Sequence, residues 1–524
     1  MALSLSGQGR DVKQNTLLIK SLKEITGYKK MTLALKYGFT EVVDKIRKPF
    51  IESSFLTHVL AVSGSTVACQ LISLVVAPIN TRLYQPADYG TMAMFTALFL
   101  VLSIPSTMRY EGALPIASDD TEATHLLLLC TLLSGVTAII AAIVVLYAGS
   151  QLATWLGMDY RMAHYLWYFP VGLFANSIFN ILSAWAIRKH AFSELSTTKV
   201  LQSLLVSIVT VSLGFLGAGF PGMIAGALIS SYAGLYRLVL LAYRAIRIQA
   251  PNLSFGALIN EAKRHYRFPL YNTWGLLLNT FSIQLPIFML TSGFGNTYSG
   301  YFSICQRVLV IPTLLISGAI APVFYSRARK AVSDGNIKQL TLRILKSIAG
   351  VNAFFIMFVG MFGEPLFSLA FGAQWARSGA YASALAPWLL FNFLVTPLAS
   401  LPLILERQKT DLLFQIVLFA VRALSISIGI YFHNDMIGMI AFGSASALYM
   451  IVYFVWLLKL VAVKAGDVFL RVGREVALAA LLLGICRIVM YVSNNNLMLT
   501  AIILVPVLAF AAIRALKQLN QSRV

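Results

Sequence analysis

The chain has 524 residues, of which 58% are hydrophobic and only 12% are charged. An average soluble domain carries about 25% charged residues, so a water-soluble protein of this length is excluded. The 41 Lys and Arg residues outnumber the 20 Asp and Glu residues and give a net charge of +21. Such an excess indicates binding to nucleic acid, binding to anionic lipid, or a signal that orients the protein in a membrane.

Residues 1–55 form a basic segment that precedes the first long apolar run. Phe39, Val42, Ile46 and Phe50 recur there at helical spacing beside basic residues, as in a helix that lies at an anionic membrane surface. We predict a cytoplasmic or interfacial segment that leads as an elbow into the first membrane span.

Fourteen apolar runs then follow, each long enough to cross a hydrocarbon core of about 30 Å as a helix. They predict an all-α polytopic membrane protein with about fourteen transmembrane helices. Its loops are too short to hold a folded domain. The runs cover residues 56–79, 91–114, 126–148, 163–187, 200–219, 221–243, 268–292, 300–324, 346–363, 380–405, 412–432, 436–458, 475–492 and 497–514.

Two passages about 210 residues apart indicate an internal repeat. Each has a short loop followed by a glycine that opens a span, Gly90 in APINTRLYQPADYGTMAMF (77–95) and Gly300 in TSGFGNTYSGYFSICQRVLVIP (291–312). Duplicated halves with a site at their interface are the usual plan of a secondary transporter. The repeat predicts two six-helix bundles, which cover residues 56–243 and 268–458. A cytoplasmic linker, 244–267, joins them, and two additional helices in 459–514 and a cytoplasmic tail, 515–524, follow the second bundle.

The positive charges alternate with the spans. With fourteen spans, 35 of the 41 Lys and Arg residues fall on the side of the N-terminus. The opposite side has only Arg82, Arg161 and Arg377. This asymmetry predicts that both termini are cytoplasmic, and it removes most of the case for nucleic acid as a partner.

Three segments carry a resemblance to a known family: TRLYQPADYG, STMRYEGALPIASDDTEA (106–123) and GYFSICQRVLVIPTLLISGAIAPVFYSRA (300–328). In this order and spacing the chain resembles the Wzx-like bacterial oligosaccharide and O-antigen flippases, the polysaccharide transporter branch of the MOP exporter superfamily. The resemblance implies that an undecaprenyl-diphosphate-linked oligosaccharide moves from the cytoplasmic to the periplasmic leaflet of the bacterial inner membrane by alternating access.

The same resemblance implies that the partners are the lipid-linked oligosaccharide and membrane lipids, together with the polysaccharide polymerase and glycosyltransferases that handle the same glycan. Coupling to H⁺ or Na⁺ is a hypothesis. No cofactor and no metal are expected, since GxxxxGK[ST], HExxH and CxxC patterns are all absent. The four cysteines fall within predicted spans and suggest neither a disulfide framework nor a zinc site.

A lipid-linked diphosphate sugar needs fixed cations and polar groups in a cavity, and an intramembrane arginine is a functional hypothesis by default. Arg307 lies about one third into the eighth span beside Gln306, and Arg422 lies near the middle of the eleventh. Arg487 lies near the end of its span, where it can snorkel to the surface. We expect Arg307, Gln306 and Arg422 to bind substrate.

The seventh span is polar and contains Pro269 and Pro286 as bending points, which suits a cavity wall and adds Asn272 and Asn279 as substrate-binding candidates. Two short-range pairs of opposite charge are expected to act as structural or gate ion pairs. These pairs are Arg82 with Asp88 and Arg109 with Glu111.

Two alternatives stay open. One is a membrane-embedded glycan polymerase, ligase or glycosyltransferase, although such enzymes commonly need a long extracytoplasmic loop or paired carboxylates. The other is a cation-coupled drug exporter of the same superfamily, although no acidic residue lies in the middle of a span. We predict a transporter and not an enzyme.

Overall fold

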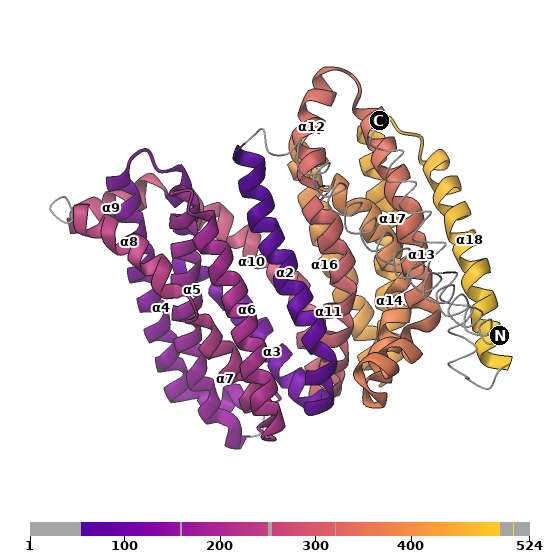
Figure 1. The fold of residues 1–524 in the computed structure, drawn as a ribbon, viewed down its shortest axis with the longest axis horizontal. Helices are drawn as coiled ribbons and strands as arrows, with labels where there is room; N and C mark the ends of the chain where they lie inside the picture. Colours follow the sequence, from indigo (N-terminus) through magenta and orange to yellow (C-terminus); the bar gives the residue numbers. More distant parts are fainter. Residues whose placement is uncertain (1–53, 158–159, 250–253, 320, 493–506, 508–524) are drawn as a thin grey trace, which may run out of the picture. The chain divides into compact units, whose positions relative to one another are not determined.

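The computed structural model describes residues 54–157, 160–249, 254–319, 321–492 and 507. Nearly all of the predicted N-terminal segment 1–55, most of the predicted fourteenth span 497–514 and the tail 515–524 lie outside these described residues. Within the described ranges all regular structure is helical and no strand occurs, which confirms the predicted all-α class (Figure 1).

The first half of the chain contains α2 to α8. Among them, α4 packs against α5 and α8, and α6 packs against α7. Their bounds are α2 Ser54–Leu83, α3 Pro86–Ser103, α4 Asp120–Trp155, α5 Tyr168–Arg188, α6 Phe192–Phe215, α7 Gly219–Ser231 and α8 Leu235–Gln249. The linker helix α9, Phe255–Arg264, follows and packs on α4.

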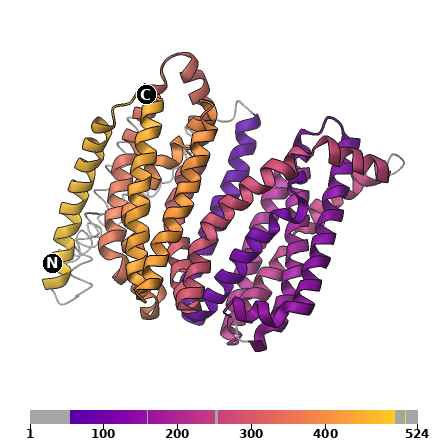
Figure 2. The ribbon, with the colours of Figure 1, turned by 180° about the vertical axis from the view of Figure 1, so that it is seen from behind.

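In the second half, α14 packs between α13 and α17, and α16 packs on α17. These helices appear in orange tones in Figure 2. The bounds are α10 Thr273–Phe294, α11 Asn296–Ala319, α12 Ala321–Ser333, α13 Ile337–Phe371, α14 Ala376–Val395, α15 Leu401–Ile404, α16 Gln408–Tyr431, α17 Asp435–Leu460 and α18 Ala465–Val492.

Twelve stretches in the described part of the chain are long and apolar enough to cross a membrane. They coincide with twelve of the fourteen predicted spans. The predicted eighth span corresponds to α11, which is helical but is not among the twelve. Thirteen of the predicted spans are therefore helical where the structure describes them.

The second predicted span, 91–114, is not one continuous helix. α3 ends at Ser103, and three short 3₁₀ turns cover most of residues 105–116. Pro105 lacks an N–H for a helical bond, and both Met108 and Arg109 adopt left-handed backbone angles, φ 50° and 61°. The sixth predicted span is likewise divided, because Gly234 adopts φ +71° between α7 and α8.

α3 and α11 lie against each other, and each carries its repeated glycine, Gly90 or Gly300, four residues after the helix starts. A Cβ on Gly90 would overlap the backbone carbonyl oxygen of Asn296, and a Cβ on Gly300 would overlap that of Pro86. Small residues let the backbones of membrane helices approach closely. The repeat found in the sequence therefore marks a contact between the two halves of the chain.

Candidate functional site

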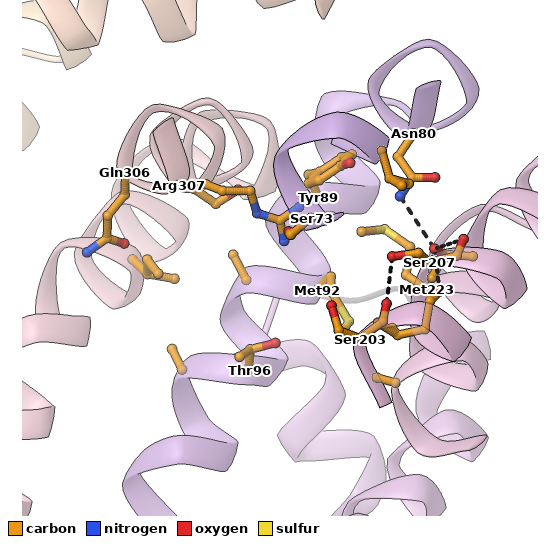
Figure 3. A pocket seen from close by; sticks show the side chains of 18 of the residues that line it. Ser73, Asn80, Tyr89, Met92, Thr96, Ser203, Ser207, Met223, Gln306 and Arg307 are labelled. Carbon is orange, nitrogen blue, oxygen red and sulfur yellow. Dashed lines mark hydrogen bonds between the residues drawn. The ribbon is translucent and has the colours of Figure 1, made fainter. Parts of the chain in front are cut away.

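A cavity of about 290 Å³ is lined by helices from both halves of the chain. α2, α3, α6 and α7 contribute from the first half, and α10 and α11 contribute from the second. Most of the polar side chains on its wall carry hydroxyl or amide groups (Figure 3). They are Ser73, Asn80, Tyr89, Thr96, Ser203, Ser207, Thr210, Gln284, Ser303, Gln306 and Arg307.

Arg307 supplies the positive charge of this cavity. Its side chain extends from α11 toward Tyr89 of α3, and its guanidinium carbon lies 6.0 Å from the centre of that ring (Figure 3). The ring face attracts the cation but leaves its N–H donors available. No Asp or Glu among the described residues forms an ion pair with Arg307, so an anion entering the cavity meets an uncompensated charge.

The wall on α2 and α6 carries several hydroxyl and amide groups among apolar side chains such as Val76 and Val206. The Asn80 side chain donates to Thr210 Oγ1 at 3.4 Å, and the Ser203 hydroxyl donates to the Cys69 carbonyl at 3.2 Å. The amide oxygen of Asn80 is buried without a hydrogen-bond partner. A buried unpaired acceptor costs free energy, so a ligand that donates a hydroxyl hydrogen would be stabilised here.

A second cavity of about 190 Å³ contains Arg422. Arg422 Nη1 donates to the carbonyl and hydroxyl oxygens of Ser282 at 3.1 and 3.2 Å. Its Nε and the indole nitrogen of Trp388, which also lines this cavity, are buried without partners. Gln306 lines both cavities, and its neighbour Arg307 on α11 lines the first.

The other intramembrane candidates lie elsewhere. Asn272, at the end of a π-helical turn over Phe268–Asn272, and Asn279 on α10 are both exposed and line neither of these cavities. Arg487 lies over the Phe362 ring at 5.8 Å and contacts Met490. The expected role of Asn272 and Asn279 in substrate binding stays a prediction.

Arg82 and Asp88 do not form the predicted ion pair with each other. Arg82 donates to the carbonyl oxygens of Pro78 and Leu369. The Asp88 carboxylate accepts the backbone N–H of Gln85 and that of Phe220, both at 3.0 Å. Backbone donors at two helix starts satisfy this carboxylate, because helix N-termini favour negative charge.

Arg109 and Glu111 do form an ion pair, with 2.8 Å between Nη1 and Oε1. The Glu111 carboxylate is buried and also accepts the Thr107 hydroxyl. The left-handed backbone at Arg109 reverses the chain within the 3₁₀ turns and brings the two side chains together. Whether this pair opens during a transport cycle stays a prediction.

An ion pair that sequence reasoning missed joins α14 to α17. Arg377 donates through Nε and Nη2 to the two oxygens of Asp435 at 3.0 and 2.6 Å, and the Tyr381 hydroxyl donates to the same carboxylate. Both charged residues lie between predicted spans, and their 58-residue separation gives no signal in the sequence. Two-point binding of a carboxylate by arginine is strong and geometrically specific.

We predict that Asp435→Asn lowers the thermal stability of the protein, because Arg377 loses a charged partner and Tyr381 loses a charged acceptor. Arg377 is 42% exposed, so the expected cost is about 1–3 kcal/mol rather than that of a fully buried pair. The readout is the melting temperature of the purified protein. Asp467→Asn, at an exposed position, is the control; equal melting temperatures for both variants would contradict the prediction.

Comparisons with known proteins agree with this architecture. The family described as "Polysaccharide biosynthesis protein" matches residues 79–380. No curated protein matches the chain.

Solved structures show the same fold at low sequence identity. The lipid II flippase MurJ in an inward closed conformation has a TM-score of 0.65 and 14% identity, over 87% of this chain and 97% of that chain. A multidrug resistance MATE family transporter of the MOP superfamily, inward-facing, has a TM-score of 0.61 and 16% identity, over 75% and 94% of the two chains. A MOP superfamily transporter from Pyrococcus furiosus has a TM-score of 0.51 and 15% identity, over 77% and 95%.

Proposed function

Because the chain belongs to the polysaccharide biosynthesis protein family, we propose that it is a flippase for an undecaprenyl-diphosphate-linked oligosaccharide. It would move this lipid from the cytoplasmic to the periplasmic leaflet of the bacterial inner membrane, for the synthesis of a surface polysaccharide such as O-antigen. The observation that carries the proposal is the unpaired Arg307 in a hydroxyl-lined cavity between helices of both halves.

The chemistry of the cavity fits the head group of such a lipid. A diphosphate offers several anionic oxygens, which arginine binds through paired N–H donors. Sugar hydroxyls both donate and accept hydrogen bonds, as do the Ser, Thr and Asn side chains of the wall on α2 and α6. Arg307 would hold the diphosphate, Gln306 and this wall would hold the first sugars, and the prenyl chain would stay in the lipid.

The cavity is partly open, and its enclosed volume of about 290 Å³ lies just below the range of ligand pockets, about 300–1,000 Å³. An oligosaccharide head group held at Arg307 would therefore extend beyond this space. Its passage to the other side of the membrane would require α3 and α11 to separate, which is the movement that alternating access between two halves would supply. Both termini would stay cytoplasmic, as the charge distribution predicts.

A cationic drug as substrate is disfavoured by the same cavity. None of the described residues that line it is acidic, and its charged residue is an arginine. Neither of the two cavities that contain Arg307 and Arg422 includes a pair of carboxylates for acid–base chemistry on a glycan. These compositions support transport of an anion over drug export or polymerisation.

Movement of a dianion outward across an inside-negative membrane is favoured by about 2.3 kcal/mol per charge per 100 mV. Bound arginines or counter-ions would cancel part of this driving force. Coupling to H⁺ or Na⁺ stays a hypothesis, and flipping rates that ignore both ion gradients would contradict it.

Deletion of the gene in its host tests the proposed substrate. We expect surface polysaccharide to disappear and the lipid-linked oligosaccharide to accumulate in the cytoplasmic leaflet. Reintroduction of the intact gene should reverse both effects. Normal export with altered chain length would instead indicate a polymerase. A changed drug sensitivity with normal polysaccharide would indicate an exporter.

For Arg422 we predict a smaller loss than for Arg307. Arg422→Met should lower the flipping rate about threefold to tenfold, because a second cation near Gln306 disappears while the first remains. Arg422→Lys, which keeps the charge, should retain more activity. Rates are measured at equal amounts of membrane-inserted protein, and an unchanged rate in Arg422→Met would remove this residue from the site.

A further inference from the structure

Three metal-ligating side chains meet where the linker helix α9 packs on the first turn of α4. His265, directly after α9, places Nε2 at 2.8 Å from Glu122 Oε1 and at 3.7 Å from Glu261 Oε2. The three ligand atoms all lie within 4.8 Å of one another. Glu261 and His265 are four residues apart and share one side of the helix end, whereas Glu122 comes from a different part of the sequence.

The cluster is shielded from water. The side chains of Glu122, His265 and Glu261 are 5%, 14% and 17% exposed. Glu261 Oε2 is buried and accepts no hydrogen bond from any described group. A buried carboxylate oxygen without a partner is costly, and it points to a missing proton or cation beside His265.

The distances suit a small tetrahedral metal ion. With ligand bonds of about 2.0–2.2 Å, the edges between ligand atoms in a tetrahedral site are about 3.3–3.6 Å. The two distances from His265 Nε2, 2.8 and 3.7 Å, lie on either side of this value, so small shifts of the side chains would bring both carboxylate oxygens to tetrahedral spacing from the imidazole. Imidazole combined with two carboxylates favours zinc-class ions over Mg²⁺ and Ca²⁺, which prefer oxygen ligands alone.

We propose that Glu122, Glu261 and His265 bind one divalent transition-metal ion of the zinc class. Three protein ligands leave the fourth position of the ion for water. The bound ion fastens the linker helix α9 to α4, and this function is independent of which lipid the protein moves.

Arg264 provides a test that separates a metal site from a purely structural cluster. Its Nη1 lies 3.2 Å from Glu122 Oε2, the oxygen that does not face His265. As a structural partner, Arg264 stabilises the cluster. In a metal site, its positive charge opposes the incoming cation, and its removal strengthens binding.

The cluster lies where a bound ion would restrain the helix α10 that follows it. The Tyr110 hydroxyl donates to the carbonyl of Ala262 in α9 at 3.0 Å, so the 3₁₀ turns after α3 also hold this helix. Three residues after His265, Phe268 starts the π-helical turn that leads into α10, which lines the first cavity through Gln284. An ion at this point restrains the start of a cavity-lining helix.

The test measures metal binding to the full-length protein in detergent or nanodiscs. Purified protein is stripped with chelator and titrated with Zn²⁺, and Co²⁺ is used as a spectroscopic probe of tetrahedral coordination. We expect one tight site per chain. His265→Asn and Glu261→Gln should each weaken it at least tenfold, whereas Arg264→Gln should tighten it about threefold or more.

His190→Asn and Glu364→Gln are the matched controls. Both wild-type residues are exposed and lie outside the cluster, and Asn tolerates the left-handed backbone of His190. Unchanged zinc stoichiometry and affinity in His265→Asn and Glu261→Gln would overturn the proposal, as would weaker binding in Arg264→Gln. If the ligand variants fail to fold, the Arg264→Gln titration and a zinc-dependent rise in the wild-type melting temperature still decide it.

Discussion

Replacement of Arg307 by alanine should abolish most of the flipping activity while the protein still inserts in the membrane. Arg307 is the positive charge of the first cavity, and no described carboxylate neutralises it. Each hydrogen bond to a charged group is worth about 1.5–3 kcal/mol, so losing one or two of them, about 1.5–6 kcal/mol, corresponds to a rate about tenfold to ten-thousandfold slower. Arg307→Lys keeps the charge without the planar pair of donors and should retain partial activity.

Arg487→Ala is the matched control for this experiment. Arg487 is also an intramembrane arginine, but it packs on Phe362 and lies in neither of the two cavities. Its loss removes the same charge from the membrane-spanning part without touching the site. Equal rates for Arg307→Ala and the wild type would remove Arg307 from substrate binding, and equal losses in both alanine variants would indicate a general effect of charge.

Replacement of Gly300 by alanine should strongly destabilise the contact between α3 and α11. The new methyl group would overlap the carbonyl oxygen of Pro86, a backbone atom that cannot rotate away. Overpacking of this kind costs about 1–3 kcal/mol and occasionally more. Gly90→Ala meets the Asn296 carbonyl in the same way and should have a similar effect. We expect a lower melting temperature and a lower flipping rate in both variants.

Gly135→Ala in α4 is the control for the glycine variants, because a Cβ there meets no atom within 4 Å. Alanine is also the better helix former, so this variant should be as stable as the wild type or slightly more stable. If Gly300→Ala and Gly135→Ala melted at the same temperature, the close approach of α3 and α11 would not hold the described conformation.

The helical class and most spans could be predicted because hydropathy over a span is a local property. The repeat glycines were also visible in the sequence, and the structure gives their reason in the contact of Gly90 with Asn296 and of Gly300 with Pro86. Arg307 and Gln306 could be singled out as candidates because a charged or amide side chain within an apolar run is conspicuous. Their common cavity depends on six helices and was not predictable from spacing.

The failures came from partners that are distant in sequence. Asp88 was expected to pair with nearby Arg82, but the backbone N–H of Phe220 at the start of α7 competes for its carboxylate. The Arg377–Asp435 pair and the cluster of Glu122 with His265 depend on helix packing, so no local sequence pattern predicts them. Asn272 and Asn279 are exposed and line neither of the two described cavities, so their role in substrate binding stays a prediction.

The most direct test of the proposed function is flipping in proteoliposomes. The purified protein is reconstituted with an undecaprenyl-diphosphate oligosaccharide, and a membrane-impermeant glycan-modifying enzyme reports which leaflet holds the lipid. The proposal predicts that the wild type exposes the inner pool of this lipid and that Arg307→Ala does so at least ten times more slowly. An inner pool that stays protected with the wild type, or is exposed equally fast with Arg307→Ala, would contradict it.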